Sequence, residues 1–489
     1  MAWLGASLPN GESRLYFLCI FFGIGASVWG YNIGILSSVI VSSGWRDALQ
    51  QPTRAMIGTV VSIYYTGTFI SYLCISHPIT DWLGRRYAAL SGTAFVCLGA
   101  ILQATSGGST ARGTMLAGRL ISGVGVAVVS TSVPLYQAPF LWMEIDHSSG
   151  DNPRHDLWDR VALGPGNVSP SIKPKKSLRT NSRRPRWLVE HGRKDQARST
   201  LRWLREGSFD DDEIEHEFSA IIKSVDEYHQ SGSNWLSLFR QKPLFNRLWR
   251  ATLLQFMSSS CGATAIKYFL PWLLEQHGIF SHTALLISAT ESTVKIGFTV
   301  LEMFIIDRFG RRKCLVAGCI IMAFSLLING AVPLLDPQRK SPATDIICVA
   351  FIFVYVIGFS LGFGPTAWVY NTEIFPTSVR ARGLNFASAG ASVGSSIVTM
   401  VWSAGIGYMG SNIYFIFMVV NIICIPAIYA FFPETKGREL EDMDALFGAI
   451  ETRRSDVDNL SEHLLQDDAP FRDSLESAAG AERDRNLIQ

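Results

Sequence analysis

Residues 307–312 read Asp-Arg-Phe-Gly-Arg-Arg, and residues 81–86 read Asp-Trp-Leu-Gly-Arg-Arg. Each copy follows a long apolar stretch and occupies the corresponding place in its own hydrophobic block, residues 15–136 or 248–432. Glycine allows two helix ends to approach, aspartate can cap a helix N-terminus, and arginine can bind carboxylates or helix C-terminal carbonyls. Internal repeats in a membrane chain are typical of secondary transporters built from two related halves. The repeat therefore predicts two helical bundles with a binding site between them.

The two blocks contain windows long enough to cross a lipid bilayer. A spanning helix needs about 20 mostly apolar residues. Ten windows of about this size occur, at residues 15–41, 57–77, 87–107, 113–136, 248–271, 282–306, 314–335, 346–371, 384–408 and 412–432. Lipid admits only helices and closed barrels, and unbroken apolar runs lack the alternation of barrel strands. The sequence therefore predicts an all-α, multi-pass membrane protein, with the first window retained as a span.

The charges between the windows predict the orientation of the chain. Lys and Arg concentrate in cytosolic loops of membrane proteins, and the basic clusters here follow the even-numbered windows. Both termini and the polar middle are therefore expected in the cytosol, and we expect the cell membrane as the location. The net charge of +2 gives no indication of a nucleic-acid partner, and we expect none.

Four regions follow from this pattern. They are an N-terminal bundle of four spans (residues 1–137), a cytosolic central segment (138–247), a C-terminal bundle of six spans (248–432) and a cytosolic tail (433–489) expected to be mostly disordered. Within the central segment, residues 186–229 carry apolar side chains at helical spacing between charges. This spacing predicts short amphipathic helices on the cytosolic face.

Several ordered motifs together resemble the sugar porter family of the major facilitator superfamily, in particular its fungal members. They are the repeated Asp-x-x-Gly-Arg-Arg, Gly118-Arg119, Pro134-Leu135-Tyr136, Pro185-Arg186-Trp187-Leu188, Gly364-Pro365 with Trp368, and Pro433-Glu434-Thr435-Lys436-Gly437. The resemblance implies two pseudo-symmetric helix bundles that move a small polar solute by alternating access, with sugar as the first expectation. It also implies a monomer in the lipid bilayer that uses no cofactor.

The resemblance fails in residues 138–184. Members of the family have twelve spans, whereas this chain has about ten, because a polar segment replaces the fifth and sixth. The family's fourth span closes with a Glu where Pro139 stands here. Two explanations remain open: a genuine ten-span variant, or an incorrectly spliced gene model whose true product has twelve spans. A truncated, non-functional product is a further alternative.

The resemblance places Arg119 beside a proton-coupling acid of the first span. In proton-coupled relatives that acid follows Gly-Tyr, whereas Gly30-Tyr31 is followed here by Asn32. An amide does not titrate, while a carboxylate beside an arginine can. We therefore expect facilitated diffusion, with proton symport through another acid as the alternative, and Asn32 and Arg119 as the coupling residues. A charge reaching the headgroups from a helix end is the other interpretation of Arg119.

The substrate residues implied by the resemblance differ from those of a hexose porter. The family's Gln, Gln and Asn of the seventh span correspond to Ser258, Ser259 and Thr264, which offer shorter reach and fewer hydrogen bonds. Lys295 stands where a sugar-contacting Asn is common, one helical turn after Glu291. These two form a structural ion pair or recognise a charged solute. Trp368 and Ser395 complete the expected substrate-binding set, and Lys267 is expected at the membrane interface.

A charged cluster on the cytosolic face is expected to act as a conformational gate whose ion pairs break and re-form. Its members are Asp81, Arg85, Arg86, Asp307, Arg311, Arg312, Glu373, Arg380 and Glu434.

The sequence leaves alternatives to a sugar carrier open. Transport of an organic acid or secondary metabolite, including efflux, is the main alternative, and a nutrient sensor that binds without translocating is another. No phosphate loop, nucleophile elbow or metal-ligand motif occurs. We therefore expect no enzymatic activity, no catalytic residues and no metal ion.

Overall fold

The computed structural model describes a helical core and parts of the central segment. The described residues are 27–28, 30–146, 188–189, 192–205, 214–215, 218–219, 221–222, 235–276, 281–335, 342–376 and 379–436. Within these ranges every regular element is a helix. The all-α class predicted from the apolar windows is therefore the one observed.

The N-terminal half consists of a helix over residues 30–39 and the elements that follow it. These are α3 (Ser43–Ala48), α4 (Arg54–Ile70), a π-helical turn (Ser71–Ile75), α5 (Ser76–Ala104), a 3₁₀ turn (Gly108–Thr110) and α6 (Ala111–Asp146). The side chain of Thr53 caps α4 by accepting a hydrogen bond from the Met56 backbone N–H. This bond satisfies one of the donors that every helix start leaves unpaired.

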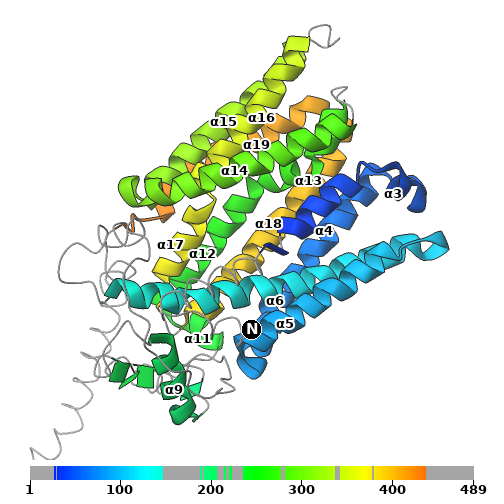
Figure 1. The fold of residues 1–489 in the computed structure, drawn as a ribbon. Coiled ribbons are helices and arrows are strands. Elements are labelled where there is room, and N and C mark those ends of the chain that lie inside the picture. Colours follow the sequence, from blue (N-terminus) through cyan, green and yellow to red (C-terminus); the bar gives the residue numbers. More distant parts are fainter. Residues whose placement is uncertain are drawn as a thin grey trace, which may run out of the picture.

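The C-terminal half is larger. It contains α11 (Trp235–Arg240), α12 (Lys242–Ser260), α13 (Ala263–Gln276), α14 (Ser281–Phe309), α15 (Arg311–Leu335), α16 (Pro342–Gly362), α17 (Pro365–Ile374), α18 (Arg380–Met409), a 3₁₀ turn (Gly410–Asn412) and α19 (Ile413–Phe431). Figure 1 shows α14, α15, α16 and α19 on one side of the molecule, and α5 and α6 on the opposite side, with α4 and α18 between them.

Seven helical segments of the described residues are long and apolar enough to cross a membrane. They are Arg54–Thr80, Tyr87–Ala104, Ala111–Ser132, His282–Phe309, Arg311–Leu335, Ala343–Ile374 and Arg380–Phe431, the last of which includes both α18 and α19. Together they cover eight of the ten predicted windows. The window at 15–41 lies largely outside the described residues, and the window at 248–271 is helical but interrupted.

The interruption at 248–271 falls at Cys261 and Gly262, between α12 and α13. Gly262 has a φ of +104°, which a residue with a Cβ rarely adopts. The carbonyl of Cys261 accepts hydrogen bonds from the Tyr355 hydroxyl and the Asn421 amide, both at 3.0 Å. Neighbouring helices thus satisfy a backbone acceptor that the break releases, as an apolar environment requires.

The helices present the surface expected of a lipid-facing bundle. On α14, large apolar side chains are exposed, with Ile296 at 67% and Met303 at 59%. On α19, Ile423 is 60% exposed. Apolar exposure on this scale is costly in water but favourable against hydrocarbon. The chain is therefore a multi-pass membrane protein.

Small residues allow the helices to pack closely. A Cβ placed on Gly318 of α15 would lie 2.5 Å from the Cα of Gly362 on α16. Without a hydrophobic driving force between helices, such close backbone contacts supply the packing energy in a bilayer. The pairing of α15 with α16 thus depends on two specific glycines.

The described parts of the central segment are helical and pack around apolar side chains. Residues 188–189, α9 (Lys194–Arg205) and the described residues between 214 and 222 form a small apolar cluster. Figure 1 shows α9 outside the two bundles. The buried members of the apolar cluster are Leu188, Val189, Ala197, Leu201, Ile214, Phe218 and Ile221. Of the polar segment 138–184, residues 138–146 form the end of α6, and residues 147–184 lie outside the described residues.

Candidate functional site

The structure brings Arg119 and Asn32 together. Arg119 on α6 is 1% exposed, and its Nη1 donates to Asn32 Oδ1 at 2.9 Å. Its guanidinium carbon lies 4.6 Å from the centroid of the Tyr64 ring on α4. Nε and Nη2 of Arg119 are buried and have no hydrogen-bond partner among the described residues. The arginine is therefore an interior group and does not extend to the headgroups.

A row of aromatic rings connects this arginine to the C-terminal half. Tyr64 packs edge-to-face on Tyr65 at 5.3 Å between ring centroids, and Tyr65 packs edge-to-face on Tyr268 of α13 at 6.2 Å. The Tyr64 hydroxyl is buried without a hydrogen-bond partner in the described part of the chain, while the Tyr268 hydroxyl is within reach of Tyr65 and Arg119. Arg119 thus lies beside a contact between the halves, a feature that sequence motifs did not indicate.

Two lysines lie over a single aromatic ring in the C-terminal half. Lys267 Nζ of α13 and Lys295 Nζ of α14 are 5.0 and 5.5 Å from the centroid of Phe359 on α16. Lys267, for which the sequence favoured an interfacial position, therefore lies beside Lys295. Glu291 is 5% exposed and accepts a hydrogen bond from the Ser292 hydroxyl at 3.2 Å. The described residues contain no ion pair within 4.0 Å between Glu291 and either lysine.

Thr264 and Ser395 are also brought together. Their hydroxyl oxygens on α13 and α18 are 3.3 Å apart, and both side chains are buried. Ser258 is buried on α12. Ser259 is partly buried and packs against α18, where a Cβ at Gly394 would lie 3.0 Å from the Ser259 Cβ. Of the predicted serines and threonine, Thr264 and Ser395 thus form a polar pair, while Ser259 contributes to helix packing.

Hydroxyl groups connect the two halves along α4 and α18. Thr68 donates to Ser392 at 2.8 Å, and the Ser62 and Ser396 hydroxyls share a short hydrogen bond. Nearer the start of α18, Arg382 Nε donates to His77 Nε2 at 2.9 Å. The sequence indicated Ser395 of α18 but not these hydrogen bonds between α18 and α4, which became visible only in the packed structure.

Trp368 lies on α17, directly after the break at Gly364 and Pro365, and is half-buried. The break is stabilised by Glu302 of α14, which is fully buried. Glu302 Oε1 accepts the Thr366 backbone N–H at 3.1 Å and also the Thr366 hydroxyl. A carboxylate at a helix N-terminus satisfies free N–H groups and the helix dipole. Sequence analysis missed Glu302, although an acid inside an apolar window is a detectable signal.

The second copy of the repeated motif forms a charged cluster around Gly310, which has a φ of +94°. Glu434 accepts the backbone N–H groups of Arg311 and Arg312 at 2.9 and 3.1 Å, and so caps α15. The capping carboxylate thus comes from the segment after α19, while Asp307 pairs with Arg311 at 3.4 Å.

Arg311 provides the strongest ion pair of this cluster. Its Nη2 and Nε donate to Glu373 Oε1 of α17 at 2.6 and 3.1 Å, and Thr435 donates to Glu373 Oε2 at 2.7 Å. Arg312 instead donates to the carbonyl of Tyr429 at the end of α19. Most of the predicted gate residues of this half therefore meet. Arg380 donates from Nε to the carbonyl of Phe375. The structure does not describe the side chains of the other three predicted gate residues, Asp81, Arg85 and Arg86.

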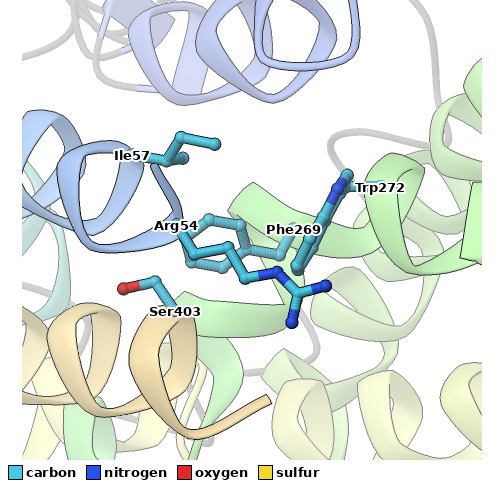
Figure 2. A pocket seen from close by; sticks show the side chains of 5 residues that line it. All are labelled: Arg54, Ile57, Phe269, Trp272 and Ser403. Carbon is cyan, nitrogen blue, oxygen red and sulfur yellow. The ribbon is translucent and has the colours of Figure 1, made fainter. Parts of the chain in front are cut away.

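The halves also meet at the opposite end. Arg46 of α3 pairs with Glu275 of α13 at 3.4 Å. Arg54 of α4 lies over the Trp272 ring, 5.5 Å from its centroid. Figure 2 shows the small pocket that Arg54, Ile57, Phe269, Trp272 and Ser403 line, of about 10 Å³. This volume is about that of one water molecule, so the side chains leave little space between the halves at this pocket.

Comparison with known proteins gives a consistent result. The family described as Sugar (and other) transporter matches residues 18–140 and 183–447. The MFS-type transporter criB of Aspergillus cristatus is 28% identical over 456 residues, which cover 88% of this chain and 92% of that protein. A probable quinate permease of Aspergillus fumigatus is 24% identical over 512 residues, covering 95% and 93%.

Among solved structures, the proton:xylose symporter XylE bound to 6-bromo-6-deoxy-D-glucose is similar with a TM-score of 0.63 and 19% identity. The similarity covers 90% of this chain and all of that chain, and shows the fold. The family and fold predicted from the repeated motif are thus confirmed. The matched family ranges omit residues 141–182, within the segment where the resemblance was expected to fail.

Proposed function

The chain belongs to the family of sugar and other transporters, and on that basis we infer that it carries a small, polar, sugar-like solute across a membrane by alternating access. The observation that supports this most directly is the way the halves meet. Among the contacts of the described residues at the end that contains Arg46 are an ion pair of Arg46 with Glu275 and a cation–π contact of Arg54 over Trp272. Such contacts contribute little each and can break and re-form as the halves rock.

The solute site we propose lies on α13, α14, α17 and α18. Thr264 and Ser395 provide hydroxyls, Glu291 and Lys295 provide charged groups, and Trp368 provides an apolar face. Short hydroxyls reach less far than amides and make fewer hydrogen bonds. A hexose would therefore bind weakly here, and restoring Gln at Ser259 and Asn at Thr264 and Lys295 is expected to create hexose uptake.

The charged cluster is the proposed gate at the other end. Arg311 holds α17 through Glu373, and Glu434 holds the start of α15. Since Trp368 is on the same short helix as Glu373, movement of this helix would change the site and the gate together. The gate residues Arg312 and Arg380 bind helix-end carbonyls in this arrangement.

Asn32 and Arg119 support facilitated diffusion without proton coupling. The amide oxygen of Asn32 accepts from Arg119 but cannot take up a proton at physiological pH. We further propose a monomer in the cell membrane with both termini in the cytosol, since the basic clusters follow the even-numbered windows. The end with Arg46 and Glu275 then faces outside.

Cross-linking tests alternating access at this end. Cysteines at Arg46 and Glu275 are introduced together, the protein is reconstituted in liposomes, and a bifunctional thiol reagent joins them. Uptake of radiolabelled xylose or sorbitol should stop on cross-linking and return on cleavage of the linker. The Arg46→Cys variant treated alone is the matched control, because it reacts but cannot be bridged to α13. Full uptake by the bridged protein would refute this mechanism.

A further inference from the structure

The interior of the N-terminal half contains a cation whose charge no described residue balances. Arg119 is 1% exposed, and the polar groups that it meets in the described chain, the Asn32 amide and the Tyr268 hydroxyl, are both neutral. Guanidinium keeps its proton under all physiological conditions. A charged group in a low-dielectric interior is costly unless a counter-charge is present. The buried charge of Arg119 therefore needs a negatively charged partner, which the described residues do not provide.

The arrangement of the unpaired nitrogen atoms of Arg119 indicates which chemical group would provide the counter-charge. Nε and Nη2 form one edge of the guanidinium plane, and both are buried without a partner. Two parallel N–H groups on one edge match the two oxygens of a carboxylate, in the bidentate arrangement that arginine favours. A water molecule would satisfy the hydrogen bonds but would leave the charge uncompensated. The edge thus fits one carboxylate group.

The surroundings add groups that suit the rest of such a ligand. The buried hydroxyl of Tyr64 has no hydrogen-bond partner among the described residues, and the Tyr268 hydroxyl of the other half is within reach of Arg119 and Tyr65. In the C-terminal half, Lys267 and Lys295 share the Phe359 ring, and Glu291 is an acid near them among the described residues. The N-terminal half thus provides the buried Arg119 cation, and the C-terminal half adds two amino groups that can donate hydrogen bonds to an anionic solute.

We propose that Arg119 binds the carboxylate of the transported solute, so that the substrates are hydroxylated monocarboxylates. This inference rests on the proposed transport function and names the substrate class. The solute's carboxylate then takes up the free edge of Arg119, while its hydroxyls reach the tyrosine hydroxyls and the Thr264–Ser395 pair. Binding would neutralise a buried cation next to the Tyr65–Tyr268 contact between the halves.

Matched solutes test the carboxylate directly. D-gluconate and D-sorbitol differ only in a carboxylate against a CH₂OH group, as lactate and propane-1,2-diol do on a smaller frame. Thermal stabilisation of the purified full-length protein gives binding, and uptake into proteoliposomes gives transport. We expect the acid of at least one pair to bind ten to a hundred times more tightly than its alcohol, as charge-assisted hydrogen bonds of about 1.5–3 kcal/mol predict.

Two variants test whether Arg119 causes the preference for the acid over its matching alcohol. Asn32→Asp places a carboxylate beside Arg119 with almost no change of shape, so the ratio of acid affinity to alcohol affinity should fall at least tenfold. Arg119→Gln should have the same effect. Arg112→Gln is the matched control, because Arg112 is on the same helix but exposed. If Arg119→Gln does not yield monodisperse protein, the isosteric Asn32→Asp variant alone tests whether Arg119 causes the preference for the acid.

The outcomes separate the two levels of inference. Uptake of the alcohols without preference for the acids would overturn the carboxylate proposal and leave the transport function intact. An acid preference that survives both Asn32→Asp and Arg119→Gln would overturn the assignment to Arg119. A folded protein that binds and transports none of the four solutes would overturn the carboxylate proposal together with the sugar-like transport function.

Discussion

Arg119 and Arg311 are both buried arginines, but their surroundings are opposite. Arg311 makes two hydrogen bonds to Glu373, at 2.6 and 3.1 Å, and lies 3.4 Å from Asp307. Arg119 makes one hydrogen bond to a neutral amide and leaves one edge of its guanidinium unbonded. An arginine with carboxylates provided by the chain holds helices together, whereas one without them is available to a ligand. The comparison separates a gate from a binding site.

The largest expected loss of stability comes from removing Arg311, the cation of the Arg311–Glu373 ion pair. Arg311→Gln leaves the Glu373 carboxylate partly buried without its cation, which should lower the free energy of unfolding by about 3 kcal/mol. Arg119→Gln leaves no carboxylate unpaired and should cost much less. Thermal unfolding of the two variants in detergent measures the difference, with the exposed Arg308→Gln as a control. Equal losses for Arg311→Gln and Arg119→Gln would remove the distinction.

Supplying the missing acid should make Arg119 resemble Arg311. Asn32→Asp adds a charge-assisted hydrogen bond, and we expect the ligand-free protein to gain about 2 kcal/mol in its free energy of unfolding. The measurement is thermal unfolding at neutral pH, with Asn329→Asp on α15 as a comparison far from Arg119. Destabilisation by Asn32→Asp would show that Arg119 has a counter-charge already.

A smaller effect is expected at the turn that positions Arg311. Gly310 has a φ of +94°, and a Cβ there would lie 2.7 Å from Glu434 Oε2. Gly310→Ala should therefore cost about 1 to 2 kcal/mol of stability through backbone strain, and should weaken the cap on α15. Gly297→Ala on α14, where a Cβ meets nothing within 4 Å, is the control. A neutral Gly310→Ala substitution would mean that the turn relaxes easily.

The smallest effect is expected for a third arginine, which is exposed. Arg198 of α9 donates to Glu215 at 2.8 Å, and this bond lowers the pKa of the Glu215 carboxyl. A lowered pKa in the folded state contributes stability above the unfolded pKa, and that contribution is lost as the pH falls through the folded pKa. Because the pair is exposed, the effect should be slight.

Hydrogen–deuterium exchange of residues 194–222, corrected for the intrinsic effect of pH on exchange, measures this loss. Protection should decrease between pH 6 and pH 3 in the unaltered protein and change less in Arg198→Gln. The same decrease in both proteins would mean that another group is responsible.

Much of the fold was predictable because the bilayer imposes simple rules. Eight of the ten apolar windows fall largely within the seven long apolar helical segments of the described residues. The window at 248–271 was predicted as one span because hydropathy does not register the left-handed backbone at Gly262 or the acceptors on neighbouring helices that stabilise the break.

The candidate site was predictable where family motifs mark a position, and not where only contact defines it. Asn32 and Arg119 were paired correctly from the motifs Gly30-Tyr31-Asn32 and Gly118-Arg119. Glu302 was missed, since it belongs to none of the motifs, and its role depends on Thr366, 64 residues away in the sequence. The position of Lys267 beside Lys295 was also missed, because Phe359, which brings them together, is on a third helix.

The sequence by itself determined the class, the family and the two-bundle organisation of this protein, since these depend on apolar length and on repeated local motifs. Only the tertiary structure decided which charges are compensated. Glu373 compensates Arg311 from another helix, and no described acid does so for Arg119. The physical reason is that the electrostatic free energy of a buried charge depends on groups within a few ångströms, and in this chain those groups come from distant parts of the sequence.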